Sequence, residues 1–211
     1  MEGILFDSMH SYHDFKMILS KINIPPAVVK TNYVDIPGGD GSLDLTEALG
    51  QVRYKDRECS FTFTVLPQED FEEKKTKISN MLNGQRCKII LDKDSEYYWD
   101  GRCSVNNYQS DKNLHQIVIN ATVSPYKMRV IKTQQTVPAG NNVSRILVNG
   151  RKTVVPTIVA TEAAKIVFNG GQYNINAGTH TLLNIQLQYG NNPVTVTSNS
   201  PVTFIYQEGD L

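Results

Sequence analysis

The sequence predicts a mainly β protein with two domains: an N-terminal α+β domain, built from a sheet and one helix, and a C-terminal β-sandwich. Three observations support this prediction. The composition changes near residue 130, the part before it combines strand patterns with one helical segment, and the part after it is a series of short strands separated by turns. With 211 residues, the chain has room for two hydrophobic cores.

Charged residues are unevenly distributed along the chain. Residues 1–130 hold 34 charged residues and residues 131–211 hold only 8, while the second part contains ten asparagines and ten threonines. Such an abrupt change indicates two domains rather than one continuous core. We place the joint in the polar segment 132–140, which ends in proline and glycine, and expect domains at residues 1–132 and 138–211.

A strand followed by a helix marks the first domain. Residues 61–65 alternate large apolar side chains with threonine, which is typical of a half-buried strand, and Pro67 should end it. Apolar residues then recur at helical spacing over residues 71–82, with acidic residues in the first turn. Gly84 follows where the end of a helix favours a left-handed residue.

Three more strands complete this domain. Residues 86–91 and 96–105 read as a hairpin whose turn is the polar segment 92–95. Residues 116–124 alternate again, with one apolar face. One helix packed across such a sheet gives the predicted α+β domain.

The second domain consists of short β-rich segments between strong turn signals such as Asn149-Gly150 and Asn169-Gly170. Turns every 8 to 12 residues without a helical stretch are typical of a β-sandwich. The expected strands are residues 145–148, 157–161, 165–168, 171–175, 181–187, 194–197 and 202–206.

The overall charge excludes several classes of partner. Lysine and arginine together number 21, as do aspartate and glutamate, so the formal net charge is zero. A neutral chain has no electrostatic reason to bind nucleic acid stably or to seek an anionic membrane. No run of about 20 apolar residues predicts membrane insertion, and the first residues do not resemble a signal peptide. We therefore expect folding in a cytoplasm, with Cys59, Cys87 and Cys103 as buried thiols.

Residues that could carry catalysis or bind a metal are few, so we expect no enzyme, metal or cofactor. His10 and His13 are spaced for a metal site but lack further ligands, and we expect ordinary surface or interface histidines. His115 and His180 are expected in solvated turns. The carboxylates of the second domain do not form the facing pair that a glycosidase needs. They are Glu162, Glu208 and Asp210.

The segment Pro37-Gly38-Gly39-Asp40-Gly41 superficially resembles a phosphate-binding loop. Its spacing is wrong, no basic residue follows, and Asp40 would repel a phosphate. The three glycines more plausibly allow positive φ angles in a tight loop.

Tyrosines leave a carbohydrate-binding alternative open for the second domain. Sugar sites combine aromatic platforms with polar hydrogen-bonding groups, and Tyr173, Tyr189 and Tyr206 could supply the platforms. That half has no tryptophan, however, and core or strand-edge tyrosines are the simpler interpretation.

Taken in order along the chain, these segments resemble the distal tail protein (Dit) family of long-tailed bacteriophages. The most distinctive element is residues 36–47, followed by Gly50, Tyr54, Arg57 and the strand at 60–65. Further matching segments are Gly3, Phe6, residues 11–15, 24–26, 148–150, 155–158, 187–192 and 204–211. The resemblance implies a galectin-like C-terminal β-sandwich, with an N-terminal ring-forming (belt) domain before it.

The resemblance also implies a structural role in the virion tail, after assembly in the cytoplasm of a bacterial host. Six copies would close a ring with a central channel through which DNA passes at ejection. The expected partners are the tail tube protein, a tail-associated lysin or tip protein, and the tape-measure and receptor-binding proteins. The alternative is a virion-associated, carbohydrate-binding adhesin that acts through the C-terminal β-sandwich.

A closed ring requires a head-to-tail interface, because a two-fold contact stops at a dimer. We hypothesise that the segment 36–45 and the strand 57–65 form this seam, with strand edges pairing between copies. The alternative is that both segments only build the sheet of their own subunit. The interface residues predicted in this way are Ile36, Leu43, Leu45, Arg57, Phe61 and Phe63.

Overall fold

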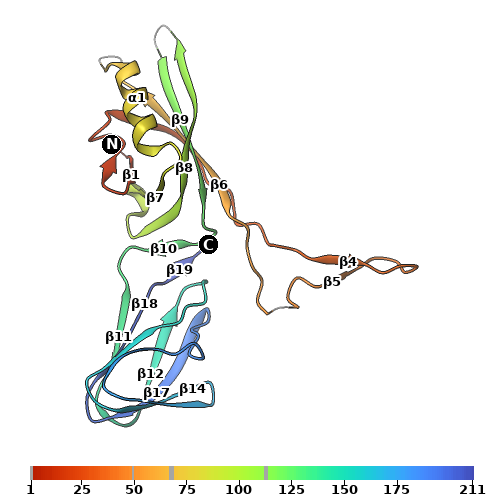
Figure 1. The fold of residues 1–211 in the computed structure, drawn as a ribbon, viewed down its shortest axis with the longest axis vertical. Coiled ribbons are helices and arrows are strands. Elements are labelled where there is room, and N and C mark those ends of the chain that lie inside the picture. The colour runs from red at the N-terminus through yellow and green to blue at the C-terminus, as the bar shows by residue number, and fades with distance from the viewer. Residues whose placement is uncertain (1, 49, 67–68, 112–113) are drawn as a thin grey trace. The chain divides into compact units, whose positions relative to one another are not determined.

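The computed structural model describes residues 2–48, 50–66, 69–111 and 114–211. The chain divides into unit 1, Met1–Lys127 with Leu211, and unit 2, Met128–Asp210. Both units consist mainly of antiparallel strands, as Figure 1 shows, and each has its own core. The expected strand end at Pro67 lies outside the described residues.

Unit 1 contains one curved antiparallel sheet with strand order β2-β1-β7-β8-β9-β6-β3. A separate hairpin, β4–β5, is inserted in the sequence between β3 and β6. The elements are β1 (Ile4–Phe6), β2 (Met9–His10), β3 (Met17–Asn23), β4 (Tyr33–Asp35), β5 (Ser42–Asp44), β6 (Arg57–Val65), α1 (Phe71–Leu82), β7 (Arg86–Leu91), the 3₁₀ turn η1 (Asp92–Asp94), β8 (Tyr97–Asp111) and β9 (Leu114–Val123).

The predicted helix is confirmed, and so are the signals at its two ends. The side chain of Asp70 caps the helix by accepting a hydrogen bond from the backbone N–H of Glu73 at 3.1 Å. Gly84 adopts φ +77° just beyond the last turn. Ile78 and Leu82 are buried against the sheet and form the core-facing side of α1. No helix among the described residues is long and apolar enough to cross a membrane.

The sheet of unit 1 curls over its own core. β1 and β6 are four positions apart in the strand order, about 19 Å in a flat sheet. Nevertheless, the ring centroid of Phe6 on β1 lies 6.3 Å from those of both Phe61 and Phe63 on β6. These edge-to-face contacts close the apolar interior between the sheet, α1 and the N-terminal segment.

Unit 2 is a sandwich of two four-stranded antiparallel sheets, ordered β11-β18-β13-β16 and β12-β17-β14-β15. Both sheets contribute alternate side chains to one core, as period-two patterning requires. The strands are β11 (Thr133–Val137), β12 (Gly140–Asn149), β13 (Thr157–Ala160), β14 (Ala164–Phe168), β15 (Gly171–Ile175), β16 (Gly178–Thr181), β17 (Gly190–Ser198) and β18 (Val202–Tyr206). Two short strands, β10 (Lys127–Arg129) and β19 (Gly209–Asp210), pair with each other.

Two sequence-based expectations about this half are wrong. The segment expected to link the domains holds β11, which pairs with β18 along its whole length, so this segment is part of the sandwich. The strand expected at residues 181–187 does not form, because β16 ends at Thr181 and an irregular loop follows.

Two buried asparagine amides hold the chain where that loop ends and β17 begins. The Asn192 amide donates to the carbonyls of Leu147, Gln188 and Gly190 at 3.2, 2.8 and 2.9 Å, and its Oδ1 accepts from the Gln188 N–H at 2.8 Å. The amide of Asn149 donates to the carbonyls of Lys152 and Leu187 at 2.9 and 3.1 Å. These side-chain hydrogen bonds add to the backbone bridge between Val154 and Leu187.

Candidate assembly interface

The chain between β3 and β6 forms a two-stranded arm that projects from the sheet of unit 1 (Figure 1). At its base, the N–H of Lys30 donates to the carbonyl of Arg53, and that of Lys55 donates to the carbonyl of Val28, both at 2.8 Å. The ring of Tyr54 packs edge-on against Tyr126, with centroids 5.9 Å apart. Backbone hydrogen bonds thus join the two chains of the arm at its base, and the base packs against the rest of unit 1.

The outer part of the arm is the β4–β5 hairpin. Val34 pairs with Leu43, whereas Tyr33 pairs with Asp44. Because paired residues share a face and alternate residues change face, Val34 and Leu43 lie on one side of the ribbon and Tyr33 and Asp44 on the other. Leu45, whose N–H donates to the Asn32 carbonyl, continues the side of Leu43.

Positive φ angles shape the loop between the two strands. Gly38 and Gly41 adopt φ +77° and +79°, a region that favours glycine, as the sequence predicts for this loop. Gly39 is not among the residues with positive φ, so the prediction is correct for two of the three glycines.

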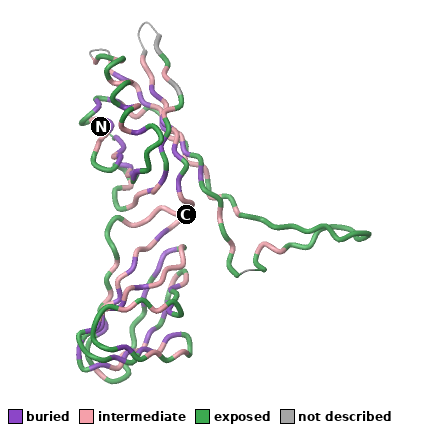
Figure 2. Tube along the Cα trace, in the orientation of Figure 1, coloured by how far each residue is buried: buried purple, intermediate pink, exposed green. Residues whose placement is uncertain are grey.

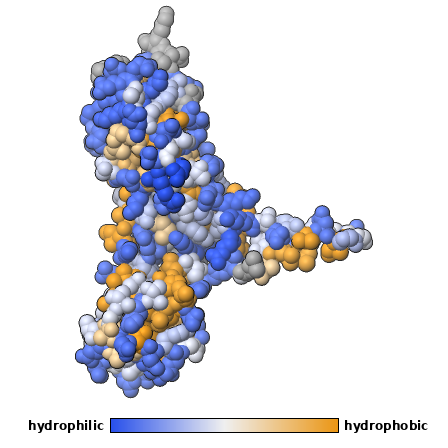
Figure 3. All heavy atoms as spheres, in the orientation of Figure 1, coloured by the Kyte–Doolittle hydropathy of each residue, from blue (hydrophilic) through white to orange (hydrophobic). Residues whose placement is uncertain are grey.

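The hairpin exposes apolar side chains that nothing in its own unit covers. Leu43, Ile36 and Val34 are 52%, 51% and 47% exposed. Figure 2 shows the arm as mostly exposed, and Figure 3 shows hydrophobic atoms along it. An isolated two-stranded hairpin is only marginally stable in water, and an exposed apolar ribbon is typical of a surface that a partner covers.

Polar contacts hold the other side of the hairpin together. The Ser42 hydroxyl donates to the carboxylate of Asp35 at 2.6 Å. The Asp44 carboxylate accepts from the backbone N–H of Thr46 at 2.9 Å, and hydrogen bonds from the Thr46 hydroxyl and N–H lower the pKa of Asp44. This side therefore carries two carboxylates beside the exposed ring of Tyr33, which leaves the Val34–Leu43 side as the aliphatic contact surface.

The six residues predicted for the interface separate into two groups. Ile36, Leu43 and Leu45 lie on the arm, and Leu45 is half-buried there. Phe61 and Phe63 are fully buried in the core of unit 1, so their assignment to an interface is wrong: their side chains cannot reach a partner. A charge at Phe61 would disrupt the core and could not report on ring formation.

Arg57, the sixth residue, lies at the point where the arm returns to the sheet. It is buried, and one of its terminal nitrogens donates to the Pro25 carbonyl at 3.3 Å. Two further guanidinium nitrogens, Nε and Nη2, have no hydrogen-bond partner among the described residues. Burial lowers the pKa of this guanidinium. The arginine supports the root of the arm from within unit 1 and does not present its charge to solvent.

Sequence reasoning missed Val34, which contributes to the same apolar side as Leu43. The alternation of Val34 and Ile36 with polar Asp35 was the available signal, because period two indicates a ribbon with one apolar side.

The sheet face opposite the core of unit 1 is polar and carries both charges. Arg86 and Arg102 stand directly opposite each other on β7 and β8. Asp100 relieves this repulsion by accepting two hydrogen bonds from Arg86, at 3.0 and 2.7 Å. Glu58 accepts from the Thr122 hydroxyl at 2.9 Å on the next strands. Because positive and negative side chains are interspersed, this face has no strong electrostatic potential of a single sign.

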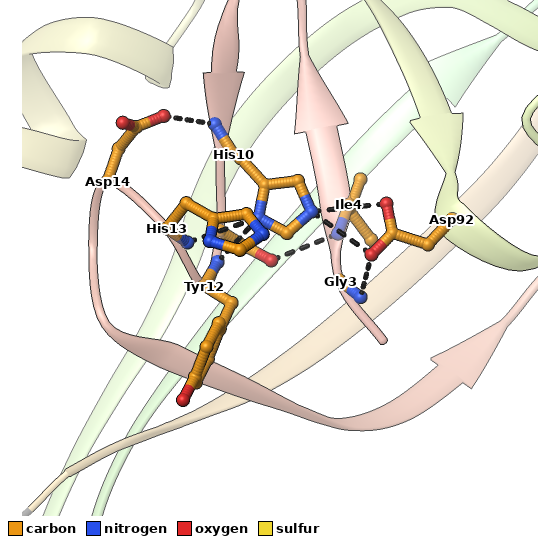
Figure 4. A network of polar contacts seen from close by, with 8 residues as sticks. Gly3, Ile4, His10, Tyr12, His13, Asp14 and Asp92 are labelled. Carbon is orange, nitrogen blue, oxygen red and sulfur yellow. Dashed lines mark hydrogen bonds and ion pairs between the residues drawn. The ribbon is translucent and has the colours of Figure 1, made fainter. Parts of the chain in front are cut away.

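The pair of histidines near the N-terminus forms a structural network rather than a ligand set (Figure 4). Nδ1 of His10 accepts from the backbone N–H groups of Tyr12 and His13, both at 3.1 Å. Its Nε2 therefore carries the proton and donates to the carboxylate of Asp92 at 3.1 Å. Asp92 also accepts from the Gly3 N–H at 2.7 Å. Both ring nitrogens of His10 are thus engaged, and among the described residues no group of three or more possible metal ligands occurs.

The other two histidines lie in strands, not in the expected turns. His115 is part of β9 and stacks on Phe71 of α1, with ring centroids 4.7 Å apart. His180 is part of β16, and its Nε2 lies 2.8 Å from the Asn176 carbonyl.

The three tyrosines of unit 2 differ in exposure. Tyr206 is buried, and its hydroxyl donates to the Val148 carbonyl at 2.6 Å. Burial raises the pKa of Tyr206 to about 12. Tyr173 packs against the core. Tyr189 is 67% exposed, and the Arg151 guanidinium lies 5.7 Å from its ring centroid.

A solved structure shares this fold. The crystal structure of the SPP1 Dit protein (gp 19.1) matches with a TM-score of 0.73 and 14% sequence identity, over 100% of each chain. That protein is described as a paradigm of the hub adsorption apparatus in phages that infect Gram-positive bacteria. No protein-family model matches the sequence, and no curated protein does. Over its whole length, the chain therefore has a Dit-like fold, as its sequence predicts.

Proposed function

We propose that this chain is a structural hub of a phage tail tip, in which six copies form a ring around a channel for DNA. The single observation that carries the proposal is the apolar side of the β4–β5 arm, which projects uncovered from a Dit-like fold. Its natural cover is a neighbouring copy, because an arm that leaves one subunit and docks on the next gives the head-to-tail contact of a ring.

The edge strands of the sheet of unit 1 are poorly suited to pairing with another copy. Its path ends at β2 on one side and β3 on the other, and β3 carries a register shift between Leu19 and Lys21. A bulge and a lysine at an edge discourage indiscriminate strand pairing. We propose that such protected edges leave the arm as the main determinant of which copy binds which.

The proposed ring joins the tail tube to a tail-associated lysin or tip protein, and it meets the tape-measure and receptor-binding proteins. It belongs to the virion tail and assembles in the cytoplasm of the bacterial host. The balanced charge supports this role, since a strongly basic channel would retain DNA rather than release it. The role requires neither catalysis nor a cofactor.

The contribution of the arm to each junction follows from its exposure. Val34, Ile36 and Leu43 each retain about half of their surface, so covering each one contributes about 1 kcal/mol. Three such side chains contribute about 3 kcal/mol, which is roughly a 100-fold change in the affinity of one junction. A Leu43→Asp variant loses one of these contacts and also places a carboxylate in the apolar contact.

The test is negative-stain electron microscopy of the purified full-length chain, scored for six-fold rings with a central hole. Rings are expected for the wild type and should be lost in Leu43→Asp, while the far-UV circular dichroism spectrum of the folded chain stays unchanged. Ile146→Asp is the matched control, because Ile146 is 53% exposed but lies in unit 2. A Leu43→Asp protein that forms rings as well as this control would refute the arm as the seam. Wild-type protein that stays monomeric at high concentration would argue against a self-assembling hub.

The carbohydrate-binding adhesin remains a second proposal, and it rests on Tyr189 alone. Its exposed ring and the neighbouring Arg151 offer one aromatic surface and one cation to a sugar. Glycan-array binding that is abolished in Tyr189→Ala would support this function. Absence of binding by the wild type to any glycan would exclude it.

A further inference from the structure

Two buried thiols meet across neighbouring strands of unit 1. Cys87 lies on β7 and Cys103 on β8, and their sulfur atoms are 3.1 Å apart. Both residues are buried, at 4% and 0% exposure. A disulfide bond is about 2.05 Å long, so each sulfur needs to move by only about 0.5 Å to reach bonding distance.

The strand register explains why the two sulfur atoms approach each other. Cys87 pairs directly with Gly101, which has no side chain, and Cys103 is two residues further along the same face of β8. A Cβ atom at Gly101 would lie 2.5 Å from the Thr122 carbonyl oxygen, so no larger residue fits there without a shift. Gly101 therefore presents no side chain to Cys87, and the Cys87 sulfur contacts the diagonal neighbour Cys103 instead.

The third thiol cannot bond to Cys103. Cys59 on β6 and Cys103 on β8 both pair with Ala121 of the intervening strand β9. Two strand spacings amount to about 9.6 Å, which exceeds the reach of a disulfide. Cys59 should therefore stay a free thiol when the other two cysteines are oxidised, which makes it an internal control.

We propose that Cys87 and Cys103 are an oxidation site that forms a disulfide and covalently joins β7 to β8. With a small disulfide such as oxidised glutathione as the oxidant, one thiolate attacks it, forming a mixed disulfide and releasing one glutathione thiol. The second thiolate then attacks the mixed disulfide and releases the other glutathione. The protein loses two electrons and two protons, and the oxidant is reduced to two thiols.

Burial controls when this reaction can occur. Both thiols are buried, so an oxidant has little access to the folded, reduced pair, and the contact with Cys103 also raises the pKa of the Cys87 thiol. Oxidation requires opening of the β7–β8 pair, or it takes place while the chain folds. Once formed, the bond closes a loop between residues 16 positions apart, which restricts the unfolded chain. This inference concerns the chemistry of unit 1 and does not depend on the proposed hub function.

The test uses the full chain, unfolded in urea and refolded in a buffer of reduced and oxidised glutathione, so that access does not limit the reaction. After denaturation, the wild type should show one free thiol instead of three, and Cys59→Ser none instead of two. Trypsin, which cuts after Arg86, Lys88 and Arg102, should release the short Cys87 peptide linked to the Cys103 peptide. The oxidised wild type should melt about 10 °C higher than the reduced protein.

Three free thiols in refolded wild type, or a peptide linked through Cys59, would overturn the proposal. Cys103→Ser should retain both remaining thiols and show no difference in melting temperature between oxidising and reducing buffers. If this variant does not fold, the Cys59→Ser thiol count decides the question, because two free thiols in that variant exclude the cross-link.

Discussion

Replacing Asn192 by aspartate tests the amide network that shapes unit 2. The change preserves the size and shape of the side chain but removes the NH₂ group that donates to three carbonyls, of Leu147, Gln188 and Gly190. A carboxylate oxygen then faces three carbonyl oxygens in a site that is 5% exposed. We expect a large loss of stability that is confined to this unit.

The size of the loss follows from the contacts. An NH₂ group has two hydrogens, so the change removes two hydrogen bonds' worth of donors at about 1 kcal/mol or more each, and burial of the charge can bring the total to about 5 kcal/mol. For a unit of this size, such a change lowers the melting temperature by roughly 20 °C. With a typical denaturation slope, it lowers the urea midpoint by about 2 M.

The single tryptophan makes the assay specific to each unit. Trp99 belongs to unit 1, so its fluorescence follows that unit, whereas far-UV circular dichroism follows both. Asn192→Asp should leave the fluorescence midpoint in urea unchanged and add an earlier transition to the dichroism curve. Asn191→Asp is the matched control, because Asn191 is the exposed neighbour on the same strand. A dichroism midpoint within about 0.5 M of that control would refute the role assigned to the buried amide.

Three further predictions concern the core, the helix cap and the buried tyrosine. Phe6→Ala removes the ring that bridges β1 to β6 and should destabilise unit 1 by about 3 to 5 kcal/mol, measured by Trp99 fluorescence in urea; a loss below about 1 kcal/mol would contradict the packing described. Asp70→Ala should cost about 1 kcal/mol in the same assay, and Asp70→Asn should restore most of it, because asparagine also accepts the capping hydrogen bond. Burial raises the pKa of Tyr206 to about 12, above the value near 10 of the unfolded chain, so the unfolded state releases this proton first. The stability of unit 2 should therefore fall as pH rises from about 10 to about 12, and Tyr206→Phe should fall less steeply in urea midpoints followed by circular dichroism.

The sequence predicts those elements of the fold whose signals are local. The helix at Phe71–Leu82 carries its own periodicity, N-cap and terminal glycine, and the β7–β8 hairpin carries its own turn. By contrast, β11 is a polar Thr-Gln-Gln-Thr stretch that becomes a strand because β18 pairs with it, and no local signal distinguishes it from a linker. The error at residues 181–187 has the same origin, since Leu187 at the end of this segment is held by distant groups, the Asn149 amide and the backbone of Val154.

The candidate interface was only partly predictable, because a sequence pattern shows that a face is covered but not what covers it. Alternation at Phe61 and Phe63 shows that one face of a strand is buried, but it does not show whether the covering surface belongs to the same subunit or to another. On the arm, Ile36 and Leu43 each lie two residues from a turn glycine, in a hairpin that is separate from the main sheet of unit 1, so little of the chain is near enough to cover them.

The arm also occupies a particular place in the topology. β3 and β6 are adjacent antiparallel strands, so the whole insertion is the connecting loop of a hairpin whose two stems are already held by the sheet. Lengthening such a loop is entropically cheap, at about 0.6 kcal/mol for each doubling. Its reach can therefore be extended or shortened without redesign of the sheet that carries it, which would let one scaffold span gaps of different width.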